Sequence, residues 1–125
     1  MQNSKLERIE KRVNELAATF NPEKINFPSY GDYPSDGNFV LVENDTYYYC
    51  NAERGILISK KPAKDEDELL CWILYDITWW HCMKAVRDDG YSGAALTRRS
   101  KQMRYDIMTQ LNESWGPMVK EQLNL

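Results

Sequence analysis

The chain has 125 residues, with 16 Lys and Arg against 19 Asp and Glu and a net charge of −3. This length predicts a single domain, residues 1–125, around one core, and the mild acidity argues against a nucleic-acid ligand while allowing a basic protein partner. The three cysteines form no C-x-x-C pair, which disfavours a disulfide framework and a zinc ribbon and indicates reduced thiols.

The first predicted element is an amphipathic helix within residues 1–20. Its apolar residues recur at spacings of three and four and are Leu6, Ile9, Val13, Leu16 and Phe20. We expect this helix to stop near Asn21 and Pro22, because proline disfavours helix in the residue before it. Charges run through the same segment and it has no apolar core of a secretory signal, so we expect the chain to be cytoplasmic.

A loop and three strands are predicted next. Proline, glycine and tyrosine within residues 28–37 indicate a loop, in which Tyr30 and Tyr33 are candidate exposed aromatic side chains. The polar pair Asn44-Asp45 is a hairpin signal between two β-prone runs, and a second turn follows at residues 52–55. The resulting prediction is a three-stranded antiparallel meander over Phe39–Glu43, Thr46–Asn51 and Ile56–Lys60.

Residues Asp65–Asp89 predict the central helix of the fold. Asp65 is placed as the N-cap and Glu68 as its capping-box partner, at the positive end of the helix dipole. The apolar residues that follow cover more than one face, so we expect this helix to lie between the sheet and other helices. Two further helices are predicted, over Ala94–Leu111 and from about Ser114. The predicted fold class is therefore α+β, with an N-terminal helix, a meander and three more helices.

Several motifs in the second part of the chain occur in a characteristic order. They are Tyr47–Tyr49, the turn Glu53-Arg54-Gly55, Asp67–Leu70, Trp72-Ile73 and Asp76–Thr78, followed by Arg98-Arg99 and Trp115. From about Thr46 to its end, the chain resembles immunity protein 63 of bacterial polymorphic-toxin and contact-dependent inhibition systems. The resemblance implies a protein that is not an enzyme, and that binds and neutralises the C-terminal toxin domain of a neighbouring effector.

The start of the central helix is one candidate surface for such a partner. Residues 65–89 hold seven acidic and two basic side chains, a net charge of −5. This charge suits either a solvated helix cap or an anionic patch that blocks the cationic cleft of a nuclease toxin. We expect Glu66 and Asp67 to be solvated and to be candidate toxin contacts. The other candidates, each with a structural alternative, are Glu53, Arg54, Tyr30 and Tyr33.

Asp76 lies inside the apolar run, where a buried carboxylate needs a cation or several hydrogen-bond donors. Arg98 or Arg99 from the next helix is the predicted partner, in a structural ion pair. Together with Lys101, Arg104 and Tyr105 these arginines also allow a nucleic-acid stripe, although a solvated helix face suits this acidic chain better.

No pattern in the chain predicts catalysis, a metal or a cofactor. His81 and Cys82 point about 100° apart on a helix, so they do not face each other as a nucleophile and base. Cys71 and Cys82 lie about 16 Å apart along the helix, too far for one metal or a disulfide. No apolar run is long enough to cross a membrane. The alternative to an immunity protein is a small cytosolic adaptor or regulatory protein-interaction module, and the oligomeric state stays open.

Overall fold

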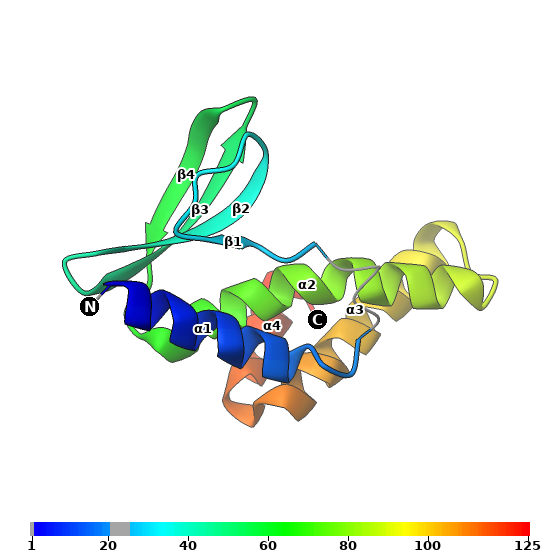
Figure 1. Cartoon of the computed structure of the whole chain (residues 1–125). Coiled ribbons are helices and arrows are strands. Elements are labelled where there is room, and N and C mark those ends of the chain that lie inside the picture. The colour runs from blue at the N-terminus through cyan, green and yellow to red at the C-terminus, as the bar shows by residue number, and fades with distance from the viewer. Residues whose placement is uncertain (1, 21–25) are drawn as a thin grey trace. The chain divides into compact units, whose positions relative to one another are not determined.

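The computed structural model describes residues 2–20 and 26–125, and these form an α+β fold (Figure 1). The described residues divide into two compact units. The first unit comprises residues 2–16 and 26–73, and the second comprises residues 17–20 and 74–125. That the whole chain is one domain stays a prediction.

Helix α1 (Gln2–Leu16) opens the first unit and packs against the first two strands. Ile9 and Val13 of its apolar stripe are fully buried, as the spacing predicts. The helix ends earlier than predicted, because the Phe20 N–H donates to the Ala17 carbonyl at 3.0 Å and so closes a tight turn after the helix. The expected stop at Asn21 and Pro22 falls outside the described residues.

The sheet has four strands, not the predicted three. In spatial order they are β1 (Ser29–Tyr30), β2 (Gly37–Glu43), β3 (Thr46–Glu53) and β4 (Ile56–Pro62). The antiparallel meander is confirmed in β2, β3 and β4 (Figure 1). The missed strand, β1, pairs in parallel with β2, and the Gly31 N–H extends this pairing by donating to the Val40 carbonyl at 2.8 Å. Two residues are too few to show strand alternation in a sequence.

Both hairpins turn through two residues with positive φ. Asn44 and Asp45 have φ of 50° and 65°, and Arg54 and Gly55 have φ of 52° and 78°. Turns of this kind match the right-handed twist of the strands, so the prediction of a turn at Asn44-Asp45 is confirmed. Arg54 adopts a backbone conformation that is unfavourable for a residue with a Cβ atom. The bond from its N–H to the Asp36 carboxylate, at 3.0 Å, helps to hold this turn.

Both faces of the sheet bury side chains. On one face Tyr49 stacks on Trp72 of α2, with a centroid separation of 6.5 Å, and the Lys61 ammonium lies 4.3 Å from the Trp72 ring centroid. The opposite face carries a separate buried cluster around Phe39 and Cys50. Tyr33, from the loop before β2, packs on Phe39 at 4.8 Å. The predicted loop over residues 28–37 therefore covers part of the sheet.

Helix α2 spans Glu66–Asp88 and contributes to both units. Its start confirms the predicted N-cap, because the Asp65 carboxylate accepts from the Glu68 N–H at 2.8 Å. Glu68 in turn accepts from the Lys64 N–H at 3.1 Å, one residue before the cap. Trp79 and Trp80 are 43% and 45% exposed, so the helix is not covered all round. Its position between the sheet and the other helices stays a prediction.

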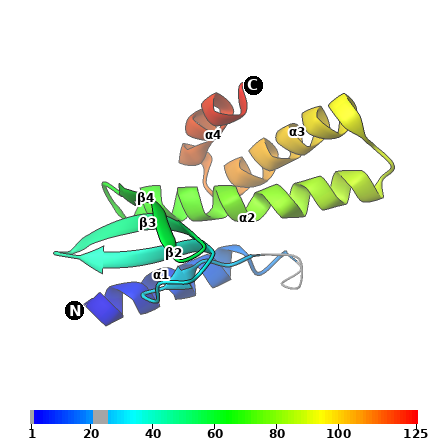
Figure 2. The same cartoon turned by 90° about the horizontal axis from the view of Figure 1, so that it is seen from above.

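The second unit also contains α3 (Gly93–Leu111), the single turn η2 (Glu113–Trp115) and α4 (Gly116–Leu123). After the turn at residues 89–92, α3 runs back beside the C-terminal part of α2, and α4 packs on α3 (Figure 2). The Asn112 side chain caps η2 by accepting from the Ser114 N–H at 3.0 Å. The buried apolar residues of this unit are Ala17, Phe20, Leu74, Ile77, Cys82, Val86, Met108, Trp115, Val119 and Leu123.

Candidate functional site

The acidic start of α2 is partly committed to contacts within its own unit. Glu66 Oε2 lies 2.7 Å from Nη2 of Arg8 and accepts from the Tyr47 hydroxyl at 3.3 Å. The hydrogen bond to Glu66 raises the pKa of the Arg8 guanidinium. The Glu66 side chain is 31% exposed, so it is only partly solvated, because it also joins α1 to β3. Asp67, one residue later, is exposed as predicted.

A second surface forms where β3 turns into β4. We call it the sheet tip, and it consists of Tyr33, Asp36, Glu53, Arg54 and the strand residues Ile56–Ile58. The loop before β2 is fastened to the turn, because the Gly55 N–H donates to the Ser35 carbonyl at 2.8 Å and the Arg54 N–H donates to Asp36. The structure thus fastens the loop that holds Tyr33 to the turn at Glu53 and Arg54.

The sheet tip also exposes apolar side chains that the sequence did not single out. Ile56, Leu57 and Ile58 are 65%, 43% and 57% exposed. Tyr33, which the sequence predicts to be exposed, is 51% exposed. Every residue of β4 is exposed, and this strand forms one edge of the sheet. Edge strands of this kind are open to pairing with another chain.

Tyr30 differs from the other predicted contacts. Its side chain is half-buried, and burial raises the pKa of the phenol. Its hydroxyl is buried without a hydrogen-bond partner in the described part of the chain. The polar atom of Tyr30 therefore does not face solvent, as a contact residue in an exposed loop would.

Asp76 is exposed, so the expectation that its carboxylate is buried was wrong. Its side of α2 faces solvent although its neighbours in the sequence are apolar. Arg98 and Arg99 are also exposed, and the Arg99 guanidinium lies 4.1 Å from the ring centroid of Tyr91. The ion pair of Asp76 with Arg98 or Arg99 stays a prediction.

The buried arginine of this unit is Arg104, which is only 7% exposed. Its Nε donates to the Tyr75 backbone carbonyl at 2.9 Å and to the Thr78 hydroxyl at 3.3 Å, and its Nη2 also donates to the Tyr75 carbonyl. Burial lowers the pKa of Arg104, although the nearby charge of Asp76 acts in the opposite direction. Arg104 lies four residues after Ser100 and four residues before Met108, and all three are buried on α3. This spacing of four was the sequence signal for the burial of Arg104.

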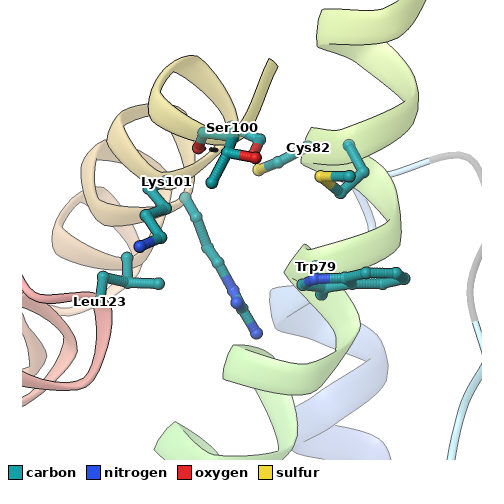
Figure 3. Close-up of a pocket in the computed structure, with 8 residues that line it drawn as sticks. Trp79, Cys82, Ser100, Lys101 and Leu123 are labelled. Carbon is teal, nitrogen blue, oxygen red and sulfur yellow. Dashed lines mark hydrogen bonds between the residues drawn. The ribbon is translucent and has the colours of Figure 1, made fainter. Parts of the chain in front are cut away.

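Arg104 borders a pocket of about 160 Å³ inside the second unit. Figure 3 shows Ser100 and Lys101 of α3 on one side, Trp79 and Cys82 of α2 on another, and Leu123 of α4 near Lys101. The complete lining is Trp79, Cys82, Met83, Thr97, Ser100, Lys101, Arg104 and Leu123. The sequence does not predict this pocket, since its walls come from three helices.

The thiols are poorly placed for nucleophilic chemistry. Cys50, Cys71 and Cys82 are free and buried. Burial raises the pKa of Cys50, and it raises the pKa of Cys71 and of Cys82 to about 12. A thiol with such a pKa is almost entirely protonated at neutral pH, and the thiolate is the reactive form.

Residues 2–20 and 26–125 contain no group of three His, Cys, Asp or Glu side chains arranged to hold a metal ion. In the same residues, no helix is long and apolar enough to cross a membrane.

Comparison with known families identifies the chain. A sequence model of immunity protein 63 matches residues 43–124. The chain belongs to the immunity protein 63 family. No curated protein and no solved structure gave a significant match.

The immunity protein 63 match contains most of the candidate sites. It begins at the last residue of β2 and runs through β3, β4, α2, α3 and α4. The turn at Glu53 and Arg54, the acidic start of α2 and the pocket beside Arg104 therefore lie within it. Tyr30 and Tyr33 lie before the matched region, so the sheet tip combines family residues with residues outside the match.

Proposed function

We propose that this chain binds the C-terminal toxin domain of a neighbouring polymorphic or contact-dependent effector and neutralises it in the cytoplasm of the producing cell. The observation that carries the proposal is the immunity protein 63 match over residues 43–124. Binding is then the entire activity, and neither a cofactor nor nucleic acid takes part. The buried thiols with raised pKa values support a binding role over nucleophilic catalysis.

The predicted toxin contacts differ in what their side chains offer a partner. Asp67, Tyr33, Glu53 and Arg54 are exposed, so we propose them as direct contacts. Glu66 has an indirect role at the start of α2, because its carboxylate is bound to Arg8 and Tyr47. Tyr30 contributes through its ring, since its hydroxyl is buried.

Co-expression tests the proposed function. The C-terminal toxin domain encoded directly upstream is expressed in a bacterial host with and without this chain, and growth and copurification are measured. We expect the chain to restore growth and to copurify with the toxin domain. A toxin domain from an unrelated effector is the control and should remain toxic. A chain that neither restores growth nor copurifies would contradict the proposal and favour an adaptor role.

A further inference from the structure

The pocket in the second unit has a positively charged lining. Lys101 and Arg104 are the charged residues among the eight that form it, and no acidic residue takes part. The two pocket hydroxyls are already engaged, because Thr97 donates to the Gly93 carbonyl and Ser100 donates to the Thr97 carbonyl. The charged groups left to meet a ligand are therefore the two cations.

Arg104 has hydrogen-bonding capacity beyond its recorded contacts. A guanidinium carries five N–H donors. The contacts with Tyr75 and Thr78 use the Nε donor and one Nη2 donor, which leaves three. The nearby charge of Asp76 also acts on Arg104. Since hydrogen bonds between a guanidinium and an anion are among the strong ones, an anion that enters the pocket gains from the remaining donors.

The size and walls of the pocket suit a short side chain that ends in a carboxylate. Its volume of about 160 Å³ is similar to that of a protein cavity that holds benzene, about 150 Å³. Trp79, Cys82, Met83 and Leu123 provide apolar surface for methylene groups. A carboxylate has two oxygens that match the fork of a guanidinium, whereas a doubly charged phosphate would lose more hydration against these walls.

The rim of the pocket has the chemistry of a protein interface. Trp79 lines the pocket and is also 43% exposed, so one aromatic ring borders both the pocket and the outer surface. Trp80 lies beside it, with ring centroids 4.7 Å apart in an edge-on arrangement. Tryptophan and arginine are the residues most enriched among side chains that dominate binding energy.

We propose that this pocket receives the carboxylate of an Asp or Glu side chain on the toxin domain, as an anchor of the complex. The carboxylate pairs with Arg104 and Lys101, and Trp79 packs against the backbone or side chains around the anchor residue. The inference rests on the proposed function, because the toxin domain supplies the acid. It assigns to the basic first half of α3 a role in protein binding that does not involve nucleic acid.

The test measures binding of the upstream toxin domain, in a catalytically inactivated form, to the full chain by calorimetry. Lys101→Glu and Trp79→Ala should each weaken the complex by about tenfold or more. A matched variant should bind within about threefold of the wild type. Lys84→Glu makes the same charge change at an exposed position of α2 that does not line the pocket.

Charge reversal on the toxin side identifies the anchor. Each surface Asp and Glu of the toxin domain is changed to Lys, and one of these changes should weaken binding to the wild type and restore binding to the Lys101→Glu chain. Melting temperatures of all variants separate loss of the contact from loss of the fold. Arg104 itself is left unchanged here, because its substitution alters the helix packing.

Other outcomes overturn the inference. If the pocket variants bind like the wild type while Ile56→Thr with Ile58→Thr weakens the complex, the toxin docks at the sheet tip. If inorganic phosphate at constant ionic strength raises the melting temperature of the wild type but not of Lys101→Glu, and toxin binding is unchanged, the pocket holds a small anion. A wild-type chain that does not bind the toxin domain at all overturns the proposed function and this inference together.

Discussion

The guanidinium of Arg104 lies over the ring of Tyr75, 3.6 Å from the ring centroid, and donates to the backbone carbonyl of the same residue. One side chain of α3 thus meets both the aromatic face and the main chain of α2. A guanidinium can do this because it is planar, weakly hydrated and carries several donors, whereas an ammonium is a strongly hydrated point charge. The contact fastens the two helices and positions Arg104 at the wall of the pocket.

The stability of Arg104 variants should depend on the charge and shape of the new side chain. Arg104→Met keeps most of the volume and buries no charge, so we expect a loss of about 1 kcal/mol in the free energy of unfolding. Arg104→Lys keeps a buried charge but loses the fork and the stacking, and we expect about 2–3 kcal/mol. Urea denaturation measures both. Equal stability of the lysine variant and the wild type would show that the planar contact with Tyr75 contributes nothing.

Glu66 and Asp67 provide a matched pair for charge reversal. Both lie in the first turn of α2, so Glu66→Lys and Asp67→Lys disturb the helix dipole to a similar extent. Only Glu66 pairs with Arg8 and Tyr47, so Glu66→Lys should lower the melting temperature more than Asp67→Lys does. Circular dichroism at low salt measures the difference. Identical melting temperatures would mean that the Arg8 contact does not stabilise the fold in solution.

What the sequence could predict here follows from local chemistry. The N-cap at Asp65 and the turn at Asn44-Asp45 depend on residues within three or four positions of each other, and both are present in the structure. The extent of α3 was predicted to within one residue for the same reason, since its signals are the glycine-containing turn before it and its apolar spacing. The family resemblance rested on short motifs of this kind.

What the sequence could not predict depends on distant partners. Arg8 and Glu66 are 58 positions apart, and nothing near either residue indicates the other. Strand β1 exists only because β2 lies beside it. Arg104 was interpreted as part of a solvated basic face, because charged residues are rarely buried. Its burial follows from the carbonyl of Tyr75 and the hydroxyl of Thr78, which lie more than twenty positions earlier.

The thiols should be unreactive in the folded protein. With a pKa of about 12, roughly one Cys71 or Cys82 thiol in ten thousand is ionised at pH 8. A thiol reagent at pH 8 should therefore modify the native chain slowly and find three thiols per chain after denaturation without reductant. Fewer than three would contradict the free-thiol assignment, and rapid reaction of the native chain would contradict the burial.

The same raised pKa values predict alkaline destabilisation. In the unfolded chain a thiol ionises near pH 8.5, whereas the folded chain holds its proton until about pH 12. Between these values the unfolded state has released protons that the folded state retains, so raising the pH favours unfolding. The contribution of Cys71 and Cys82 to stability is complete below about pH 8.5 and is lost as the pH rises toward 12. Melting temperatures of Cys82→Ala and the wild type, compared from pH 7 to 10, should converge.

Removing the Tyr30 hydroxyl should not destabilise the protein. The phenol oxygen is buried and has no hydrogen-bond partner among the described residues, so Tyr30→Phe removes a desolvated polar atom without breaking a bond. We expect the free energy of unfolding to stay within about 0.5 kcal/mol of the wild type or to increase. Tyr47→Phe is the contrasting variant, since the Tyr47 hydroxyl contacts Glu66 and the Lys5 carbonyl, and it should be less stable. A clear loss of stability in Tyr30→Phe would point to a bound water or another partner at the hydroxyl.

The open edge of the sheet should determine how the free protein aggregates. Ile56 and Ile58 are more than half exposed on β4, and aliphatic edge strands promote pairing between chains. Replacing both with Thr keeps the strand propensity and the net charge, so we expect a higher temperature of aggregation onset and an almost unchanged unfolding free energy. Ser59→Thr, on the same exposed strand, is the control and should aggregate like the wild type. Light scattering during heating measures the onset, and an unchanged onset in the double variant would show that aggregation starts elsewhere on the molecule.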